Sequence, residues 1–137
     1  MEWFRCPDGS LAVSEIAARP PGAQICSLMG YANDVDFYQA WAHLMVHEAW
    51  PTLRRNYAVG AAFFRAQGKG RIKAVHGLEK AQRELGKLII ESRMPRIGSS
   101  PSSSYEGDGF AIVRHPDTRV VEAALKRLVE VVRVQAG

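Results

Sequence analysis

The sequence predicts a mainly α-helical protein, a single-domain bundle of about four helices with a minor β element. Three observations favour this class. Long segments carry apolar residues at helical spacing, glycines and prolines separate these segments, and the connections are short enough for antiparallel neighbours. With 137 residues, the chain fits one domain, residues 1–137, and is long enough to bury a core.

The composition is that of an ordinary globular domain. Hydrophobic residues make up 47% and charged residues 23% of the chain, which argues against a disordered segment. No apolar run of about 18 residues occurs, and the N-terminal residues lack the order of a signal peptide. We therefore expect a cytoplasmic protein that does not enter a membrane. Cys6 and Cys26 lie outside any CxxC pattern, so free thiols are expected rather than a zinc site or a disulfide.

The N-terminal region, residues 1–33, is predicted to form a hairpin followed by an extended segment. Two short apolar runs flank the turn-forming residues 7–10. The Arg-Pro-Pro sequence at residues 19–21 disfavours a helix there. Residues 23–31 are short and apolar, and they fit either a buried strand or a helical turn.

Residues 34–93 are predicted to form the helical core. The first helix covers about 34–50 and ends before Pro51, with Asn or Asp residues available to cap its start. The second helix covers about 52–67, where small residues around Gly60 allow a neighbouring helix to approach closely. The expected apolar face of the first helix consists of Phe37, Trp41, Leu44 and Met45.

The third helix of this core is expected to cover residues 68–93 and to be the longest, at about 36 Å. Its apolar residues recur at spacings of three and four and form one continuous seam. The opposite side carries a row of basic residues without an acidic residue among them. The seam consists of Ala74, Leu78, Ala81, Leu85 and Leu88, and the row of Lys69, Lys73, His76, Lys80, Arg83 and Lys87.

The rest of the chain is predicted to contain a loop, a strand and a last helix. Residues 94–109 are rich in serine, glycine and proline and indicate a surface loop. In the final region, residues 110–137, a short strand near 110–114 precedes a helix capped by Asp117 or Thr118. Its valine-rich end also suits a strand. The expected buried face of this helix consists of Val121, Leu125, Leu128 and Val132.

Positive charge is concentrated in the middle of the sequence. Residues 54–96 contain eleven basic and three acidic residues, a balance of +8, whereas residues 1–53 have a balance of −4. Such segregation predicts a polyanionic partner. Nucleic acid fits best, because contacts to a phosphate backbone depend on charge and not on base sequence. The predicted contact residues are Arg54, Arg55, Lys69, Arg71, Lys73, Lys80, Arg83 and Lys87.

A family resemblance supports this interpretation. Residues 53–64, LRRNYAVGAAFF, lead through a glycine turn into the basic helix. This arrangement resembles the small α-helical subunits of multi-subunit CRISPR effector complexes, over residues 36–93 at most. The resemblance implies a non-enzymatic subunit of a ribonucleoprotein in antiviral defence, which contacts RNA or single-stranded DNA together with other protein subunits.

Two further functions are compatible with the sequence. His43 and His47 lie four residues apart and would face one side of the first helix, which makes them weak metal-ligand candidates for a metal or small-molecule enzyme. Alternatively, the basic face docks onto an acidic partner protein in a phage or defence assembly. The basic segment 68–71, GKGR, lacks the spacing of a phosphate-binding loop. The sequence therefore predicts no catalytic residue and no cofactor.

Overall fold

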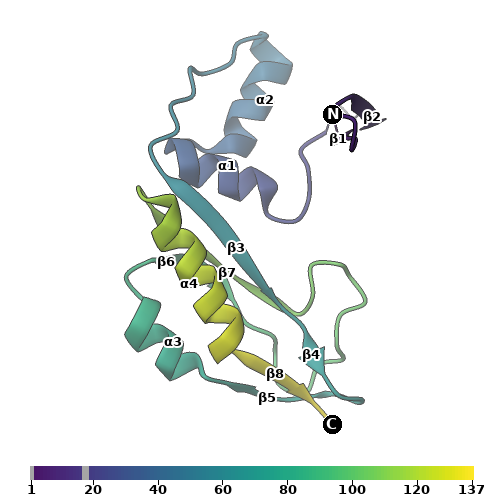
Figure 1. The fold of residues 1–137 in the computed structure, drawn as a ribbon, viewed down its shortest axis with the longest axis vertical. Coiled ribbons are helices and arrows are strands. Elements are labelled where there is room, and N and C mark those ends of the chain that lie inside the picture. Colours follow the sequence, from purple (N-terminus) through teal and green to yellow (C-terminus); the bar gives the residue numbers. More distant parts are fainter. Residues whose placement is uncertain (1, 17–18) are drawn as a thin grey trace.

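A computed structural model describes residues 2–16 and 19–137 of the chain. Within these residues the protein is mixed α/β, with eight strands in three sheets and four helices (Figure 1). The prediction of a mainly helical bundle is wrong, since 31% of the residues are helical and 29% lie in strands. None of the described helices is long and apolar enough to cross a membrane.

A three-stranded antiparallel sheet forms the centre of the molecule. Its strands are β3 (Ala58–Phe64), β7 (Gly109–His115) and β6 (Ile89–Arg93), in that order. In the middle strand, the consecutive residues Ile112 and Val113 face opposite sides of the sheet and are both fully buried. The predicted strand near residues 110–114 is thus confirmed, and it pairs with β3 and β6.

Helix α4 (Thr118–Val131) packs on this sheet, and Asp117 caps its start by accepting a backbone hydrogen bond. The predicted last helix and its cap are therefore confirmed. The chain continues as β8 (Arg133–Ala136), so the valine-rich end divides between a helix and a strand. β8 lies between β4 (Ala66–Gln67) and β5 (Ile72–His76) in a second three-stranded sheet.

The hydrophobic core lies between α4 and the sheets. Val121 and Leu128 of α4 are buried, as expected for its apolar face, and Leu125 packs beside them. The helix packs closely on the sheet at Gly60, where an added Cβ would lie 2.5 Å from the Leu125 Cδ1 atom. A helix therefore does approach Gly60 closely, but Gly60 belongs to a strand and not to the predicted helix.

The predicted helix over residues 52–67 is wrong, because residues 58–64 form β3. Ala62 and Phe64 are buried, while Phe63 between them is 36% exposed, which is the alternation of a strand. Each residue of β3 is paired with a residue of β7. The local preferences are mixed, because Ala favours a helix whereas Val and Phe favour a strand, so the distant pairing with β7 decides the conformation.

The predicted long basic helix is also wrong, since residues 68–93 contain β5, the short helix α3 (Leu78–Leu85) and β6. Gly77 interrupts the helical pattern with a φ of 82°, a left-handed conformation that a continuous helix cannot include. A Cβ at this position would also collide with the Val131 carbonyl group. The expected seam is therefore divided between separate elements.

The N-terminal part of the chain contains a hairpin and two helices. Strands β1 (Glu2–Arg5) and β2 (Leu11–Glu15) form the predicted hairpin. The segment that fitted a strand or a helix forms α1 (Ile25–Asn33). Helix α2 (Phe37–His47) confirms the first predicted helix over a shorter range. In Figure 1 the hairpin and α2 lie away from the central sheet, whereas α1 contacts β3.

Large apolar side chains are exposed mainly in this N-terminal part. Trp3 and Phe4 of the hairpin are 58% and 65% exposed, and Met45 of α2 is 60% exposed. Among the described residues of α2, Ala40 is the one that is buried. The predicted apolar face of this helix is therefore divided, with Phe37 and Trp41 partly buried and Leu44 and Met45 exposed, and α2 packs on α1.

Gly77→Ala should lower the free energy of unfolding by about 3 kcal/mol, because left-handed strain adds to a collision with the backbone of Val131. Gly98→Ala is the matched control, since Gly98 has a φ of 86° with nothing within 4 Å of an added Cβ. The control should lose about 1 kcal/mol through strain alone. Urea unfolding followed by circular dichroism measures both values. Equal losses would contradict the packing at Gly77.

Candidate active site

A cavity of about 490 Å³ lies where the N-terminal hairpin, the turn before α1 and the loop before β7 meet. Its walls contain two carboxylates, a guanidinium group and a phenol, which are groups that can bind ions and transfer protons. This combination makes the cavity the candidate active site. Its principal lining residues are Glu2, Glu15, Arg19, Gly22, Ala23 and Tyr105.

Another hollow, of about 510 Å³, lies between α3, α4 and the central sheet. It is lined mainly by apolar side chains such as Phe64, Ala111 and Leu128. Glu79 is its one charged lining residue. Because this hollow offers no cation and no pair of carboxylates, it is a poorer place for polar chemistry than the cavity at the hairpin.

Glu2 pairs with Glu15 at a register shift in the hairpin, because Trp3 pairs with Val13 and Ser14 is the extra residue between them. Both glutamates line the same cavity, and like charges on neighbouring strands repel. Arg19 approaches one of them, with its Nη2 atom 4.0 Å from Glu15 Oε1. Both partners of that contact remain exposed to solvent. The carboxylate pair can therefore accept a further cation.

The two carboxylates suit a hard divalent cation. Mg²⁺ is held by one or two carboxylates, and water and substrate phosphates complete its shell. Across residues 2–16 and 19–137, no group of three or more His, Cys, Asp or Glu residues could hold a metal ion. A cation at Glu2 and Glu15 would thus take its other ligands from water and from a molecule bound in the cavity.

The turn before α1 forms a second wall of the cavity and has an unusual backbone. Ala23 and Gln24 have φ values of 52° and 60°, in the left-handed region. Such a conformation costs a residue with a side chain about 1–2 kcal/mol. Strained residues of this kind cluster at functional sites. The backbone N–H of Ala23 donates a hydrogen bond of 2.8 Å to Glu106 Oε1, which lies on the loop before β7.

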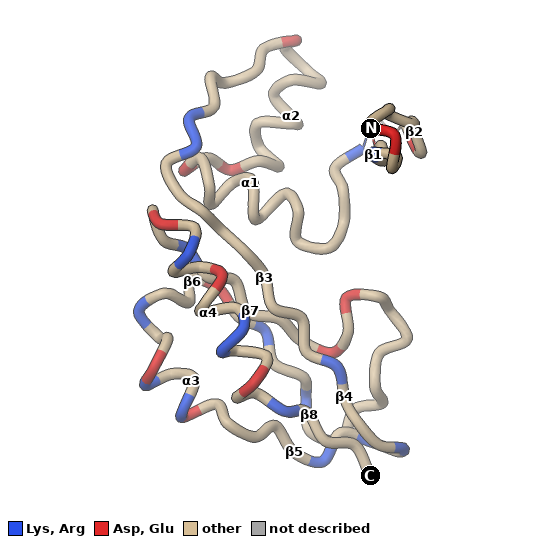
Figure 2. Tube along the Cα trace, in the orientation of Figure 1, with Lys and Arg blue, Asp and Glu red and all other residues tan. Residues whose placement is uncertain are grey.

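The eight predicted nucleic-acid contacts do not form one row. Figure 2 shows basic segments at separate places of the molecule, with acidic segments beside the basic ones on α3. Arg71 also donates a hydrogen bond of 2.8 Å to the Gly98 carbonyl oxygen. Arg54 and Arg55 precede β3, Lys69 and Arg71 lie between β4 and β5, Lys73 is on β5, Lys80 and Arg83 are on α3, and Lys87 precedes β6.

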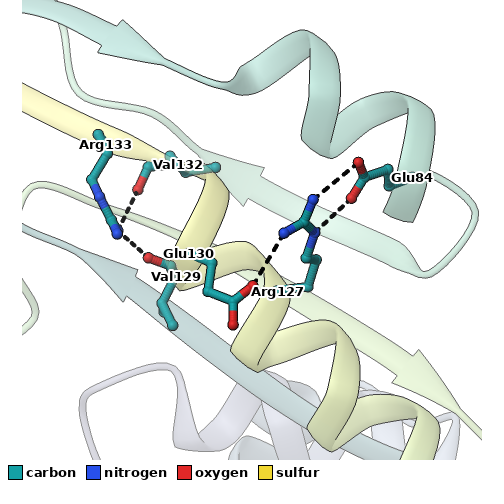
Figure 3. A network of polar contacts seen from close by, with 6 residues as sticks. All are labelled: Glu84, Arg127, Val129, Glu130, Val132 and Arg133. Carbon is teal, nitrogen blue, oxygen red and sulfur yellow. Dashed lines mark hydrogen bonds and ion pairs between the residues drawn. The ribbon is translucent and has the colours of Figure 1, made fainter.

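Charged residues of α3 and α4 form a structural network (Figure 3). Both carboxylate oxygens of Glu84 accept hydrogen bonds from Arg127, at 2.7 and 3.2 Å, and Arg127 also contacts Glu130 at 3.1 Å. The hydrogen bonds from Arg127 lower the pKa of Glu84. Arg133 donates to two carbonyl groups at the end of α4. These contacts join α3 to α4.

His43 and His47 lie together on α2, with ring centroids 4.6 Å apart. Both are exposed, and His43 Nδ1 is 3.3 Å from the Ala49 carbonyl oxygen. In the part of the chain that the structure describes, no third ligand joins them in a metal-binding group. The geometry therefore gives no support to a histidine-centred site.

The fold is shared with three solved structures. An L-amino acid ligase from Bacillus licheniformis matches with a TM-score of 0.78 and 19% identity, over 98% of this chain and 36% of that chain. An N5-carboxyaminoimidazole ribonucleotide synthetase from Thermotoga maritima matches with 0.68 and 17%, over 98% and 36%. A phosphoribosylglycinamide synthetase from Anaerococcus prevotii matches with 0.67 and 12%, over 96% and 35%. No protein-family profile and no curated protein matches the chain.

These neighbours are ligases and synthetases with the ATP-grasp fold. Their fold overturns the resemblance to small helical CRISPR subunits, and with it the expected non-enzymatic, nucleic-acid-binding role in a ribonucleoprotein. That resemblance depended on helices over 52–67 and 68–93 that the structure replaces largely with strands. The chain spans about a third of the length of the proteins that it matches.

The sequence prediction did not include the residues of the cavity. Regular pairing of the two strands of the predicted hairpin would place Glu2 opposite Ser14, so the pairing of Glu2 with Glu15 depends on a register shift that the sequence does not indicate. The contact between Glu106 and Ala23 has no sequence signal either, since it joins a loop to a turn far away in the sequence.

Cys26 lies in the first turn of α1, directly after the strained turn, and reports whether this wall is closed. Its thiol is 1% exposed, and burial raises its pKa. Because the thiolate is the reactive form, Cys26 should react with Ellman's reagent at least about tenfold more slowly than the partly exposed Cys6. Cys6→Ser should remove the fast phase. Two equal rates in the wild type would show that the turn does not cover Cys26.

Proposed function

We propose that this chain forms part of the active site of an ATP-dependent ligase of the ATP-grasp type. The carboxylates of Glu2 and Glu15, opposed across the hairpin and facing one cavity, are the observation that carries the proposal. The likeness in fold to three ligases and synthetases supports it. The highest TM-score among them, 0.78, belongs to an L-amino acid ligase, so an amino acid is the substrate class that we propose.

The residues of the cavity have separate roles in this proposal. Glu2 and Glu15 bind a divalent cation that accompanies the nucleotide. When bound, such a cation neutralises phosphate charge and polarises the phosphoryl group that is transferred. Arg19 binds an anionic oxygen, from a phosphate or from the carboxylate of the substrate, because its guanidinium group is exposed and beside the pair. The Tyr105 hydroxyl group supplies a hydrogen bond at the opposite wall.

We further propose that the remaining part of the ligase covers the N-terminal part of this chain. A two-stranded hairpin is only marginally stable alone, yet Leu11 and Val13 are 62% and 59% exposed. Apolar exposure of this extent indicates a surface that another part of the protein, or another subunit, contacts. We place the enzyme in the cytoplasm, where free thiols such as Cys6 and Cys26 stay reduced.

The Glu2→Gln, Glu15→Gln double variant should bind Mn²⁺ at least about tenfold more weakly than the wild type when ATP is present, because amides keep the shape of the carboxylates but not their charge. The electron paramagnetic resonance signal of free Mn²⁺ measures the affinity, once the Mn²⁺ that ATP binds without protein has been measured in a separate titration and subtracted. Glu122→Gln is the matched control, since Glu122 is an exposed carboxylate on α4 outside the cavity.

Two results would contradict the proposed function. One is a wild-type chain that binds no Mn²⁺ in the presence of ATP. The other is a folded double variant with the same Mn²⁺ affinity as Glu122→Gln. Circular dichroism spectra of all variants show whether each is folded.

A further inference from the structure

We propose that Glu106 is a positioning residue of the cavity, which holds the strained turn before α1 in the conformation that contacts the bound nucleotide or substrate. The turn, residues 22–24, lines the same cavity as Glu2 and Glu15 through Gly22 and Ala23. This inference rests on the proposed function, because the position of the turn matters only when a ligand fills the cavity.

The turn has one backbone hydrogen bond of its own, from the Ile25 N–H to the Gly22 carbonyl oxygen at 3.1 Å, and this bond does not involve the Ala23 N–H. Gln24 occupies the N-cap position of α1 in a left-handed conformation, and its side chain makes no capping hydrogen bond. Ala23 is also left-handed, and glycine would normally be preferred at both positions. Strained residues persist only where surrounding contacts fix them. The hydrogen bond of 2.8 Å from the Ala23 N–H to Glu106 Oε1 is such a contact, and it comes from a distant part of the chain.

The loop that carries Glu106 is itself attached to the junction between β3 and β4, where the Asp108 N–H donates a hydrogen bond of 2.7 Å to the Phe64 carbonyl oxygen. The carboxylate of Asp108 accepts hydrogen bonds of 2.7 and 2.6 Å from the backbone N–H groups of Ala66 and Ser102. Arg65 donates from Nη2 to the Ser104 carbonyl oxygen at 2.7 Å. These hydrogen bonds hold the tip of the loop in place, and the hydrogen bond from Ala23 to Glu106 holds the turn against it.

The neighbouring residue at the tip, Tyr105, has a different part. It is 75% exposed and lines the cavity, whereas Glu106 is half-buried behind it. The turn comes close to the tip because Gly22 has no side chain, since an added Cβ would lie 2.8 Å from the Tyr105 hydroxyl oxygen. Tyr105 therefore forms the wall that a ligand meets, and Glu106 fixes the turn beside that wall.

Two measurements test this role in the whole chain. Nuclear magnetic resonance gives the hydrogen-exchange rate of the Ala23 amide, and calorimetry gives the affinity for Mg²⁺·ATP. Glu106→Ala should raise the exchange rate and weaken Mg²⁺·ATP binding, each about tenfold, because one hydrogen bond to a charged group is lost. Glu106→Gln keeps an oxygen acceptor, so it should retain most of the protection of the Ala23 amide and most of the affinity for Mg²⁺·ATP. Glu122→Ala, on α4, should change neither.

A rescue variant provides a second test. Glycine takes the left-handed conformation without strain, so the Ala23→Gly, Glu106→Ala double variant should bind Mg²⁺·ATP about threefold more tightly than Glu106→Ala alone. It also replaces Glu106→Ala as the test variant if that single variant does not fold. In this case the amide of residue 23 should exchange faster in the double variant than in Ala23→Gly alone.

Unchanged exchange in folded Glu106→Ala would overturn the inference. Faster exchange with unchanged Mg²⁺·ATP affinity would overturn it as well, because the turn would then be held without any effect on the ligand. A wild-type chain that binds no Mg²⁺·ATP would remove the proposed function and the ligand-related role of Glu106 together. The exchange rates would then still decide whether Glu106 holds the turn.

Discussion

The burial of β7 on both faces is the constraint on which the rest of the structure depends. Ile112 and Val113 are both fully buried, and β7 is paired along both edges, by β3 and by β6. The backbone N–H and C=O groups of a strand in this position form hydrogen bonds with the two neighbouring strands. Its side chains pack against the layers on either face of the sheet. Helix α4 packs on the face of Val113. The loop with Tyr105 and Glu106 leads directly into this strand, so the wall of the cavity starts from the most constrained element.

The opposite face of β7 connects to the N-terminal part through polar contacts. Arg114 donates a hydrogen bond of 2.6 Å to Asp34 Oδ1 and lies 4.2 Å from the ring centre of Tyr57. The Tyr31 hydroxyl group donates to Glu91 Oε2 at 2.7 Å, and this hydrogen bond raises the pKa of Tyr31. These contacts fasten α1 to the sheet. The turn of the candidate site is therefore attached at both sides, through α1 and through Glu106.

Features with a local chemical cause could be predicted from the sequence. The hairpin follows from its turn residues, and α2 and α4 begin where Asp36 and Asp117 accept backbone hydrogen bonds. β3 could not be predicted in this way, because its alanines favour a helix and its partner strand is distant in the sequence. The seam of residues 68–93 was misleading, since it combines residues from β5, α3 and the connection to β6.

The candidate site shows the same division between local and distant causes. The hairpin itself could be predicted, but the pairing of Glu2 with Glu15 depends on a shift in its register that the sequence does not indicate. The row of cations depended on a helix that Gly77 interrupts. The contact of Glu106 with Ala23 requires the folded sheet, because the loop is positioned by Asp108 at the end of β3. The sequence alone could therefore indicate the hairpin but neither the pairing of its carboxylates nor the cavity.

The central claim is that the hairpin, the turn before α1 and the tip of the loop surround one cation-binding cavity. Paramagnetic broadening of amide signals by a small amount of Mn²⁺, added with ATP, tests it most directly. We expect the signals of Trp3, Gly22 and Tyr105 to broaden first, because these residues line the cavity or lie beside it, while those of α3 and β5 stay sharp. Broadening centred on His43 and His47, or spread evenly over the chain, would contradict the claim.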